Sequence, residues 1–238
     1  MSLKSGYIRA HSVAHFSGEA RMAARSILFD LSRQGGRFES KMSLRLVLLF
    51  ASLLAASIAC RSHPSVLTGL DQVRDHQHLF DHRNIGLVTN HTALNRHGEH
   101  IVDVFRAMPS ARVVTILSPE HGVRGEAAAG ESVENGVDPA SGIPVYSLYG
   151  EVKKPTAAIL NGVEVLVFDM QDIGARFYTY IWTLYYAMCA AAENNIPFVV
   201  LDRPNPLADR IEGPLLDEKY ASFVGLLPLP VRHGMTVG

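Results

Sequence analysis

Four short apolar runs between residues 85 and 201 constrain the fold of this chain most strongly. They span residues 85–88, 113–117, 163–168 and 198–201. The runs are continuous rather than alternating and rich in Val and Ile, which is typical of parallel strands buried on both faces. Stretches with helical spacing lie between several of them, at residues 99–108, 156–160 and 178–195. This alternation predicts an α/β fold, an open parallel sheet with helices on both faces.

The segments around these runs are predicted less sharply. Apolar residues at near-helical spacing predict a helix over residues 66–80. Residues 124–144 contain four glycines and two prolines, which indicates a long loop, and long ordered loops in compact domains are usually functional. The helix at 178–195 carries an aromatic stripe that could line a sugar pocket but that we expect to pack on the sheet. Tyr178 and Tyr180 at its start are the best candidates for an exception.

The first 60 residues differ in kind from the rest. Residues 1–41 hold seven Lys or Arg and three acids in a chain of net charge -1, and we expect them to be a misannotated or disordered extension; a genuine basic extension is the alternative. Residues 42–59 predict a signal peptide, because Arg45 is followed by fourteen uncharged residues. As a helix this run spans about 21 Å, less than the roughly 30 Å of a bilayer core, so a transmembrane anchor is the weaker interpretation.

Residues 57–59 resemble a bacterial lipobox that ends at Cys60. In such a motif the cysteine is acylated and becomes the mature N-terminus, so Cys60 is the predicted lipidation site. We therefore expect a cell-envelope protein, either a periplasmic or outer-membrane lipoprotein or a secreted one. Contact with the membrane is expected only through this lipid.

Composition and motifs exclude several classes of function. The near-zero net charge and the pI of about 6.8 give no electrostatic reason to expect nucleic acid. The residues after the first run, Thr89 and Asn90, do not continue into a G-x-G-x-x-G fingerprint, and the chain has no G-x-S-x-G and no Walker loop. No cofactor is expected. No metal is expected either, since His-Glu-x-x-His spacing is absent and we assign no ligand role to the His-x-His pair of His76 and His78.

Polar side chains collect after each of the four runs. Ligands bind beyond the carboxyl ends of the strands in open parallel sheets, so these residues predict a site. Some have a structural alternative: Asp169 and Asp202 could cap turns or pair with Arg176 and Arg203, and Asn90 could be a turn residue. The candidates are Asn90, Glu120, His121, Arg124, Asp169, Gln171, Asp172, Arg176, Tyr178, Asp202, Asn205 and, near the C-terminus, His233.

Glu120 is the candidate that is hardest to explain by structure alone. Pro119 and Gly122 set a tight turn that directs its carboxylate away from the sheet edge. Carboxylates, histidines, amides and tyrosines suit either glycoside hydrolysis or metal-dependent hydrolysis. Most glycosidases need an acid and a second carboxylate, and the missing His-Glu-x-x-His spacing favours the glycosidase.

Four motifs resemble the exo-β-N-acetylmuramidases, the bacterial family known as DUF1343, whose characterised members are the NamZ enzymes. They are GLVTNHT from Gly86, LSPEHG from Leu117, FDMQDIGARFYTY from Phe168 and LDRPNP from Leu201. The resemblance implies a Rossmann-like catalytic domain, here at residues 83–238 after a tether and first helix at 60–82. It also implies a smaller C-terminal domain, which we expect this chain to lack because it ends soon after His-Gly-Met-Thr.

The activity implied by this resemblance is release of N-acetylmuramic acid from the non-reducing ends of peptidoglycan fragments. By resemblance Glu120 is the catalytic acid, and Asp169 or Asp172 is our hypothesis for the second carboxylate. Arg176 is the first candidate to bind the lactyl carboxylate of muramate, and Arg124 the second. We expect the other candidates to contact the sugar; they are Asn90, His121, Gln171, Tyr178, Asp202, Asn205 and His233.

Two other functions stay open at this point. An exported lipoprotein of this fold could bind a sugar or muropeptide without turnover. A metal-dependent hydrolase could use His121, Asp169 and His233.

Overall fold

One mixed sheet organises the computed structural model, which describes residues 6–8, 66–125, 128 and 134–238. Its strands follow the order β1-β7-β6-β2-β3-β5-β4, and neighbouring strands are parallel except β4 and β5. The strands are β1 (Gly6–Ile8), β2 (Arg83–Thr89), β3 (Ala111–Ser118), β4 (Gly136–Val137), β5 (Pro144–Ser147), β6 (Val165–Asp169) and β7 (Phe198–Leu201).

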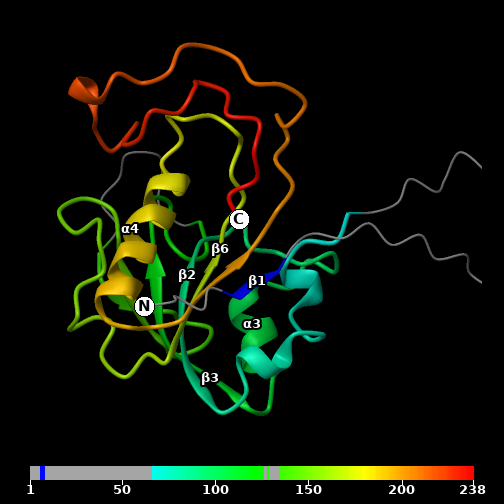
Figure 1. Ribbon diagram of the computed structural model, residues 1–238. Coiled ribbons are helices and arrows are strands. Elements are labelled where there is room, and N and C mark those ends of the chain that lie inside the picture. The colour runs from blue at the N-terminus through cyan, green and yellow to red at the C-terminus, as the bar shows by residue number, and fades with distance from the viewer. Residues whose placement is uncertain (1–5, 9–65, 126–127, 129–133) are drawn as a thin grey trace, which may run out of the picture. The chain divides into compact units, whose positions relative to one another are not determined.

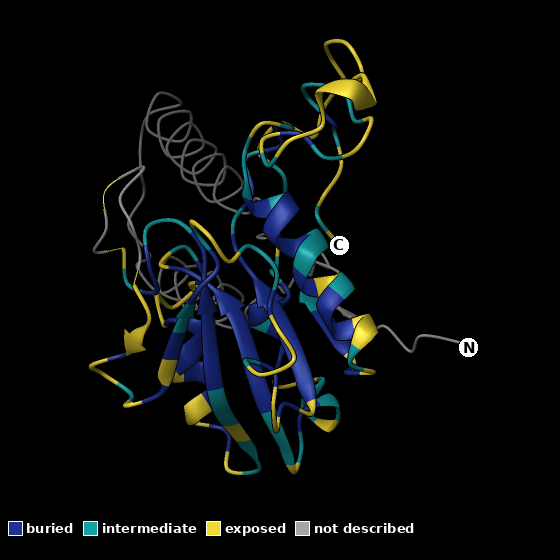
Figure 2. Cartoon of the chain, turned by 90° about the vertical axis from the view of Figure 1, so that its left-hand side faces the viewer, coloured by how far each residue is buried: buried dark blue, intermediate teal, exposed yellow. Residues whose placement is uncertain are grey.

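Helices cover both faces of this sheet, as the sequence predicts. Side chains alternate between the two faces along each strand. On β2, Leu87 packs into the core cluster that contains α3 (Ile101–Arg106), whereas Val88 packs into the one that contains α4 (Tyr180–Glu193). Figure 1 shows α3 and α4 on opposite sides of the central strands, and Figure 2 shows those strands buried along most of their length. The predicted α/β fold is confirmed.

Two predicted helices are absent from the described residues. The stretch 66–80 forms two short 3₁₀ helices, η1 (Leu70–Gln72) and η2 (Gln77–Leu79), instead of one α-helix. Its start is pinned to the sheet, since the backbone N–H of Gly69 donates to the carbonyl of Asp202 at 2.8 Å. The stretch 156–160 forms hydrogen-bonded turns.

The predicted loop at residues 124–144 carries more structure than expected. It contains β4, and β5 starts at its last residue, Pro144. Strand β5 pairs with β3 and extends the sheet beyond it. Its four residues include a proline, which makes the run too short and too irregular to be recognised as a strand from periodicity.

The N-terminal part contributes one described strand. β1 pairs in parallel with β7, with Tyr7 opposite Val200. Whether residues 1–41 are an extension outside the mature protein stays a prediction. The predicted signal peptide and Cys60 lie outside the described residues. Within the described ranges no helix is both long enough and apolar enough to cross a membrane.

Gly69 is a position where only glycine fits. A Cβ added there would lie 2.5 Å from the Leu201 Cα, against backbone that cannot move aside. We expect Gly69→Ala to lower the free energy of unfolding by about 1–3 kcal/mol, the usual cost of overpacking. Urea unfolding followed by fluorescence of Trp182, the single tryptophan, measures this. Gly136→Ala is the matched control, because a Cβ there meets nothing within 4 Å, and an equal loss in both variants would contradict the packing argument.

Candidate active site at the carboxyl ends of the strands

The loops that follow β2 and β6 meet at the carboxyl edge of the sheet. The two strands pair up to their last residues, with Thr89 opposite Asp169. Beyond them, the Thr92 hydroxyl accepts a hydrogen bond from the Gln171 backbone N–H at 3.0 Å and donates one to Oδ1 of Asn90 at 2.6 Å. The predicted gathering of polar residues from separate strand ends is therefore present.

Glu120 lies in the turn after β3 and is half-buried. The turn needs two consecutive left-handed residues, His121 at φ 75° and Gly122 at φ 73°. The Tyr149 hydroxyl, which follows β5, donates to Oε1 of Glu120 at 3.1 Å. Burial raises the pKa of Tyr149, and the carboxylate of Glu120 raises it further. The β3 and β5 ends thus hold this carboxyl between them.

Tyr180 begins α4 and Tyr178 lies two residues before it, and the charge of Glu120 acts on Tyr180. The rings of Tyr178 and Tyr180 meet edge to face at 4.7 Å between centroids. Burial raises the pKa of the Tyr180 hydroxyl, as do the neighbouring Tyr178 hydroxyl and the charge of Glu120, while the Asn90 side chain lowers it. The Nδ2 atom of Asn90 is buried and has no hydrogen-bond partner among the described residues. Asn90, Tyr178 and Glu120 thus all act on Tyr180.

Two histidines lie beside the same turn. The rings of His91 and His121 meet edge to face at 5.9 Å between centroids. Burial lowers the pKa of His91, and His121 lowers it further. Gly125, with φ at 80°, lets the β3 loop approach this ring, because a Cβ there would lie 3.1 Å from Cγ of His91.

Asp169 is fully buried and its two carboxylate oxygens are bound by one arginine. Nε of Arg203 contacts Oδ1 at 2.5 Å and Nη2 contacts Oδ2 at 3.0 Å. Nη2 also donates to the Leu94 carbonyl at 3.1 Å. Burial raises the pKa of Asp169, and the guanidinium opposes that rise. This arrangement matches the structural alternative for Asp169, with Arg203 as its partner.

Asp172 and His233 form a second buried pair. Nε2 of His233 lies 3.3 Å from Oδ2 of Asp172, and the same oxygen accepts the Gly174 N–H at 2.7 Å. Burial is the main cause of the raised pKa of Asp172. Its other oxygen, Oδ1, has no hydrogen-bond partner within the described part of the chain. Asp172 therefore differs from Asp169 in having an acceptor that the described fold does not use.

Four further predicted site residues hold loops together. Nη1 of Arg176 donates to the carbonyls of Pro214 and Leu229, which fastens the long segment after β7. This segment is the orange to red trace in Figure 1. The three others bind backbone in the same way: Nε2 of Gln171 donates to the Pro204 carbonyl at 2.9 Å, Nδ2 of Asn205 to the Met235 carbonyl at 2.8 Å, and Oδ1 of Asp202 accepts from the Gly238 N–H at 3.1 Å.

Arg124 faces a different region from Glu120, although both follow β3. Its guanidinium contacts Asp138 through Nε at 3.1 Å and Nη2 at 3.2 Å, and Asp103 through Nη1 at 3.2 Å. It lines a pocket of about 380 Å³ with His91 and His100. Arg124 thus forms part of a second polar pocket beside the Glu120 turn.

The alternative metal set is not assembled. Within the ranges that the structure describes, no three His, Cys, Asp or Glu side chains lie close enough to share an ion, so His121, Asp169 and His233 do not form a ligand group.

Tyr149 and Arg203 were not among the predicted site residues. Tyr149 follows β5, a strand that the pattern did not reveal. The signal available for it was the Val-Tyr-Ser-Leu stretch after Pro144. Arg203 had a clearer signal. It lies two residues after the end of the buried run at 198–201, and the sequence offers it as a partner of Asp169.

Comparisons with known proteins agree with these motifs. Residues 85–238 match the family model described as exo-beta-N-acetylmuramidase NamZ, N-terminal. The curated peptidoglycan beta-N-acetylmuramidase NamZ of Bacillus subtilis (strain 168) is 48% identical over 200 residues, which cover 81% of this chain and 48% of that protein.

Two crystal structures of DUF1343 family proteins from Bacteroides fragilis NCTC 9343 resemble the fold. One has a TM-score of 0.66 at 41% identity and covers 72% of this chain and 43% of its own. The other has a TM-score of 0.64 at 37% identity and covers 73% and 45%. The chain spans about half the length of the curated relative, and the matches also cover less than half of each solved chain.

Proposed function

Because this chain belongs to the NamZ family of exo-β-N-acetylmuramidases, we propose that it acts in hydrolysing peptidoglycan fragments, releasing N-acetylmuramic acid from their non-reducing ends. The observation that carries the proposal is the placement of Glu120. Glu120 follows β3 at the carboxyl edge of the sheet and is half-buried, its Oε1 accepts the Tyr149 hydroxyl, and its charge acts on Tyr180. The 48% identity to a NamZ enzyme supports the same activity.

Glu120 has the role of general acid in this proposal. Cleavage of a glycosidic bond needs a proton on the leaving oxygen, and a carboxylic acid beside that oxygen supplies it. Tyr149 orients the carboxyl by holding Oε1. Tyr178, which is partly exposed, offers its hydroxyl group to the sugar, whereas Tyr180 and Asn90 are buried. Asn90 stays a candidate for an amide contact, because its Nδ2 has no hydrogen-bond partner among the described residues.

For the second carboxylate we favour Asp172 over Asp169. Arg203 binds both oxygens of Asp169, whereas Oδ1 of Asp172 has no partner among the described residues. A carboxylate in this role assists an attacking water or attacks the sugar itself, depending on its separation from the acid. Arg176 stays our candidate for the lactyl carboxylate.

We also propose that the protein works in the cell envelope, anchored by a lipid on Cys60. The predicted signal peptide supports export, and the sugars of peptidoglycan are met outside the cytoplasm. Mass spectrometry of the protein from its native membrane tests the anchor. An acylated Cys60 at the N-terminus is the expected result, and a mature chain starting elsewhere would contradict it.

The activity is tested with a chromogenic β-N-acetylmuramide and the full chain. We expect release of the chromophore. The competing function is a sugar-binding lipoprotein, which would show saturable heat of binding in calorimetry with no product. That outcome would show that the protein binds the sugar without hydrolysing it.

Replacing Tyr149 by Phe is expected to lower kcat by about tenfold with little change in KM, because the variant loses orientation of the acid but no sugar contact. Tyr146→Phe, on β5 itself, is the matched control. A change in KM alone would show that Tyr149 does not orient the acid.

A further inference from the structure

A polar pocket lies beside the Glu120 turn and has no role in the proposed mechanism so far. We call it the α3 pocket; it is lined by His91, Leu94, Gly98, Glu99, His100, Asp103 and Arg124. We propose that the α3 pocket binds the neutral sugar on the leaving side of the scissile bond, the unit to which N-acetylmuramic acid is attached. This inference rests on the proposed function and adds the second half of the substrate to it.

The position of the α3 pocket suits a neighbouring sugar. Arg124 belongs to the same loop as Glu120, and His91 of the pocket meets His121, the residue next to Glu120, at 5.9 Å between ring centroids. A sugar in the pocket would thus lie beside the turn that carries Glu120. The volume of about 380 Å³ falls within the roughly 300–1,000 Å³ of small-molecule sites.

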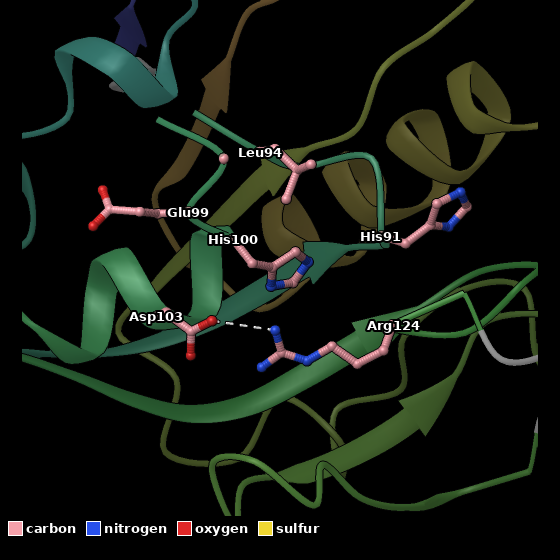
Figure 3. A pocket seen from close by; sticks show the side chains of 7 residues that line it. His91, Leu94, Glu99, His100, Asp103 and Arg124 are labelled. Atoms are coloured by element: carbon pink, nitrogen blue, oxygen red, sulfur yellow. Dashed lines mark hydrogen bonds and ion pairs between the residues drawn. The ribbon is translucent and has the colours of Figure 1, made fainter. Parts of the chain in front are cut away.

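The charges of the α3 pocket argue against an anionic ligand. Arg124 is the only cationic lining residue at neutral pH, and Asp103 and Asp138 already engage its guanidinium. Figure 3 shows Arg124 and Asp103 joined in this way below His100. Glu99 adds a further carboxylate to the lining. Acidic side chains therefore outnumber the one guanidinium in this region. Their negative charge repels the lactyl carboxylate of muramate, whereas an uncharged sugar ring meets no such repulsion.

The remaining groups match the surface of a neutral amino sugar. Carboxylates of Glu99 and Asp103 are strong acceptors for hydroxyl groups. Burial lowers the pKa of His91, which favours the neutral imidazole, a donor at one nitrogen and an acceptor at the other. His100 shapes the pocket wall instead, because its Nε2 bonds the Asn90 carbonyl and its Nδ1 accepts the Val102 N–H. Leu94 is 43% exposed and offers apolar contact to the C–H face of a sugar ring.

The test compares two substrates that share the muramate and differ in the leaving group. One is 4-nitrophenyl β-N-acetylmuramide, and the other is the β-linked disaccharide of N-acetylmuramic acid and N-acetylglucosamine. In the full chain, Leu94→Trp places an indole in the pocket from an exposed position. We expect kcat/KM to fall about tenfold more for the disaccharide than for the aryl muramide. Leu215→Trp, 65% exposed on the segment after β7, is the control and should change neither.

Equal effects of Leu94→Trp on both substrates, or no effect on either, would overturn the proposal while leaving the muramidase intact. If the wild type cleaves neither substrate, the proposed function fails, and the pocket is then judged by calorimetric titration with N-acetylglucosamine. Binding that Leu94→Trp removes would still support a neutral sugar site. Identical titrations of the wild type and the variant would exclude it.

Discussion

Replacing Glu120 by Gln is expected to lower kcat for the muramyl disaccharide by about 10²–10⁴-fold, the usual contribution of a general acid. The amide keeps the shape of the side chain and can still accept the Tyr149 hydrogen bond, but it has no proton to give to the leaving oxygen. KM should change little, since the substrate contacts are retained. Initial rates over a range of substrate concentrations separate the two parameters.

The leaving group distinguishes an acid from a nucleophile at this position. Nitrophenolate departs without full protonation, so the loss in Glu120→Gln should be much smaller for the aryl muramide than for the disaccharide. Glu218→Gln, at the exposed start of the 3₁₀ helix η3 (Glu218–Tyr220), is the matched control and should retain the wild-type rate. If Glu120→Gln lowers kcat equally for both substrates, Glu120 is not the general acid.

Replacing Arg203 by Met is expected to lower the free energy of unfolding by about 3–5 kcal/mol, because it leaves the buried Asp169 carboxylate without its partner. Asp169 has no exposed surface, and the two described contacts to its oxygens both come from Arg203. Water cannot reach the carboxylate to compensate. Urea unfolding followed by Trp182 fluorescence measures the change.

Two variants make this result specific to a buried pair. In Asp169→Leu with Arg203→Met, both charges are gone, and we expect most of the stability to return. Lys154→Met removes an exposed ion pair with Glu193, whose side chains are 39% and 58% exposed, and should cost at most about 1 kcal/mol. A loss in Arg203→Met no larger than in Lys154→Met would show that Asp169 does not depend on its arginine.

The strands were predictable because burial on both faces leaves a strong mark in the sequence. The run at 85–88 lies within β2, and the run at 198–201 is β7. The gathering of polar residues beyond them followed from the parallel topology alone. The helix predicted at 178–195 nearly matches the bounds of α4, because the inner face of this segment is apolar over several turns.

The features of the site that the sequence did not predict depend on contacts between segments that are distant along the chain. Whether Asp169 is free or paired is decided by Arg203, 34 residues later, and the sequence offered Arg176 as an equal partner. Arg124 was the second candidate for the muramate carboxylate because its own acids, Asp103 and Asp138, could not be recognised as neighbours. The residues were visible, but their pairing was not.

The central claim is tested most directly with a short β-linked glycan that carries N-acetylmuramic acid at its non-reducing end. The same glycan capped by a further N-acetylglucosamine serves as the comparison, and products are followed by mass spectrometry. We predict steady release of N-acetylmuramic acid from the first glycan and none from the second. Equal cleavage of both glycans, or saturable binding of the first without any product, would contradict the assignment.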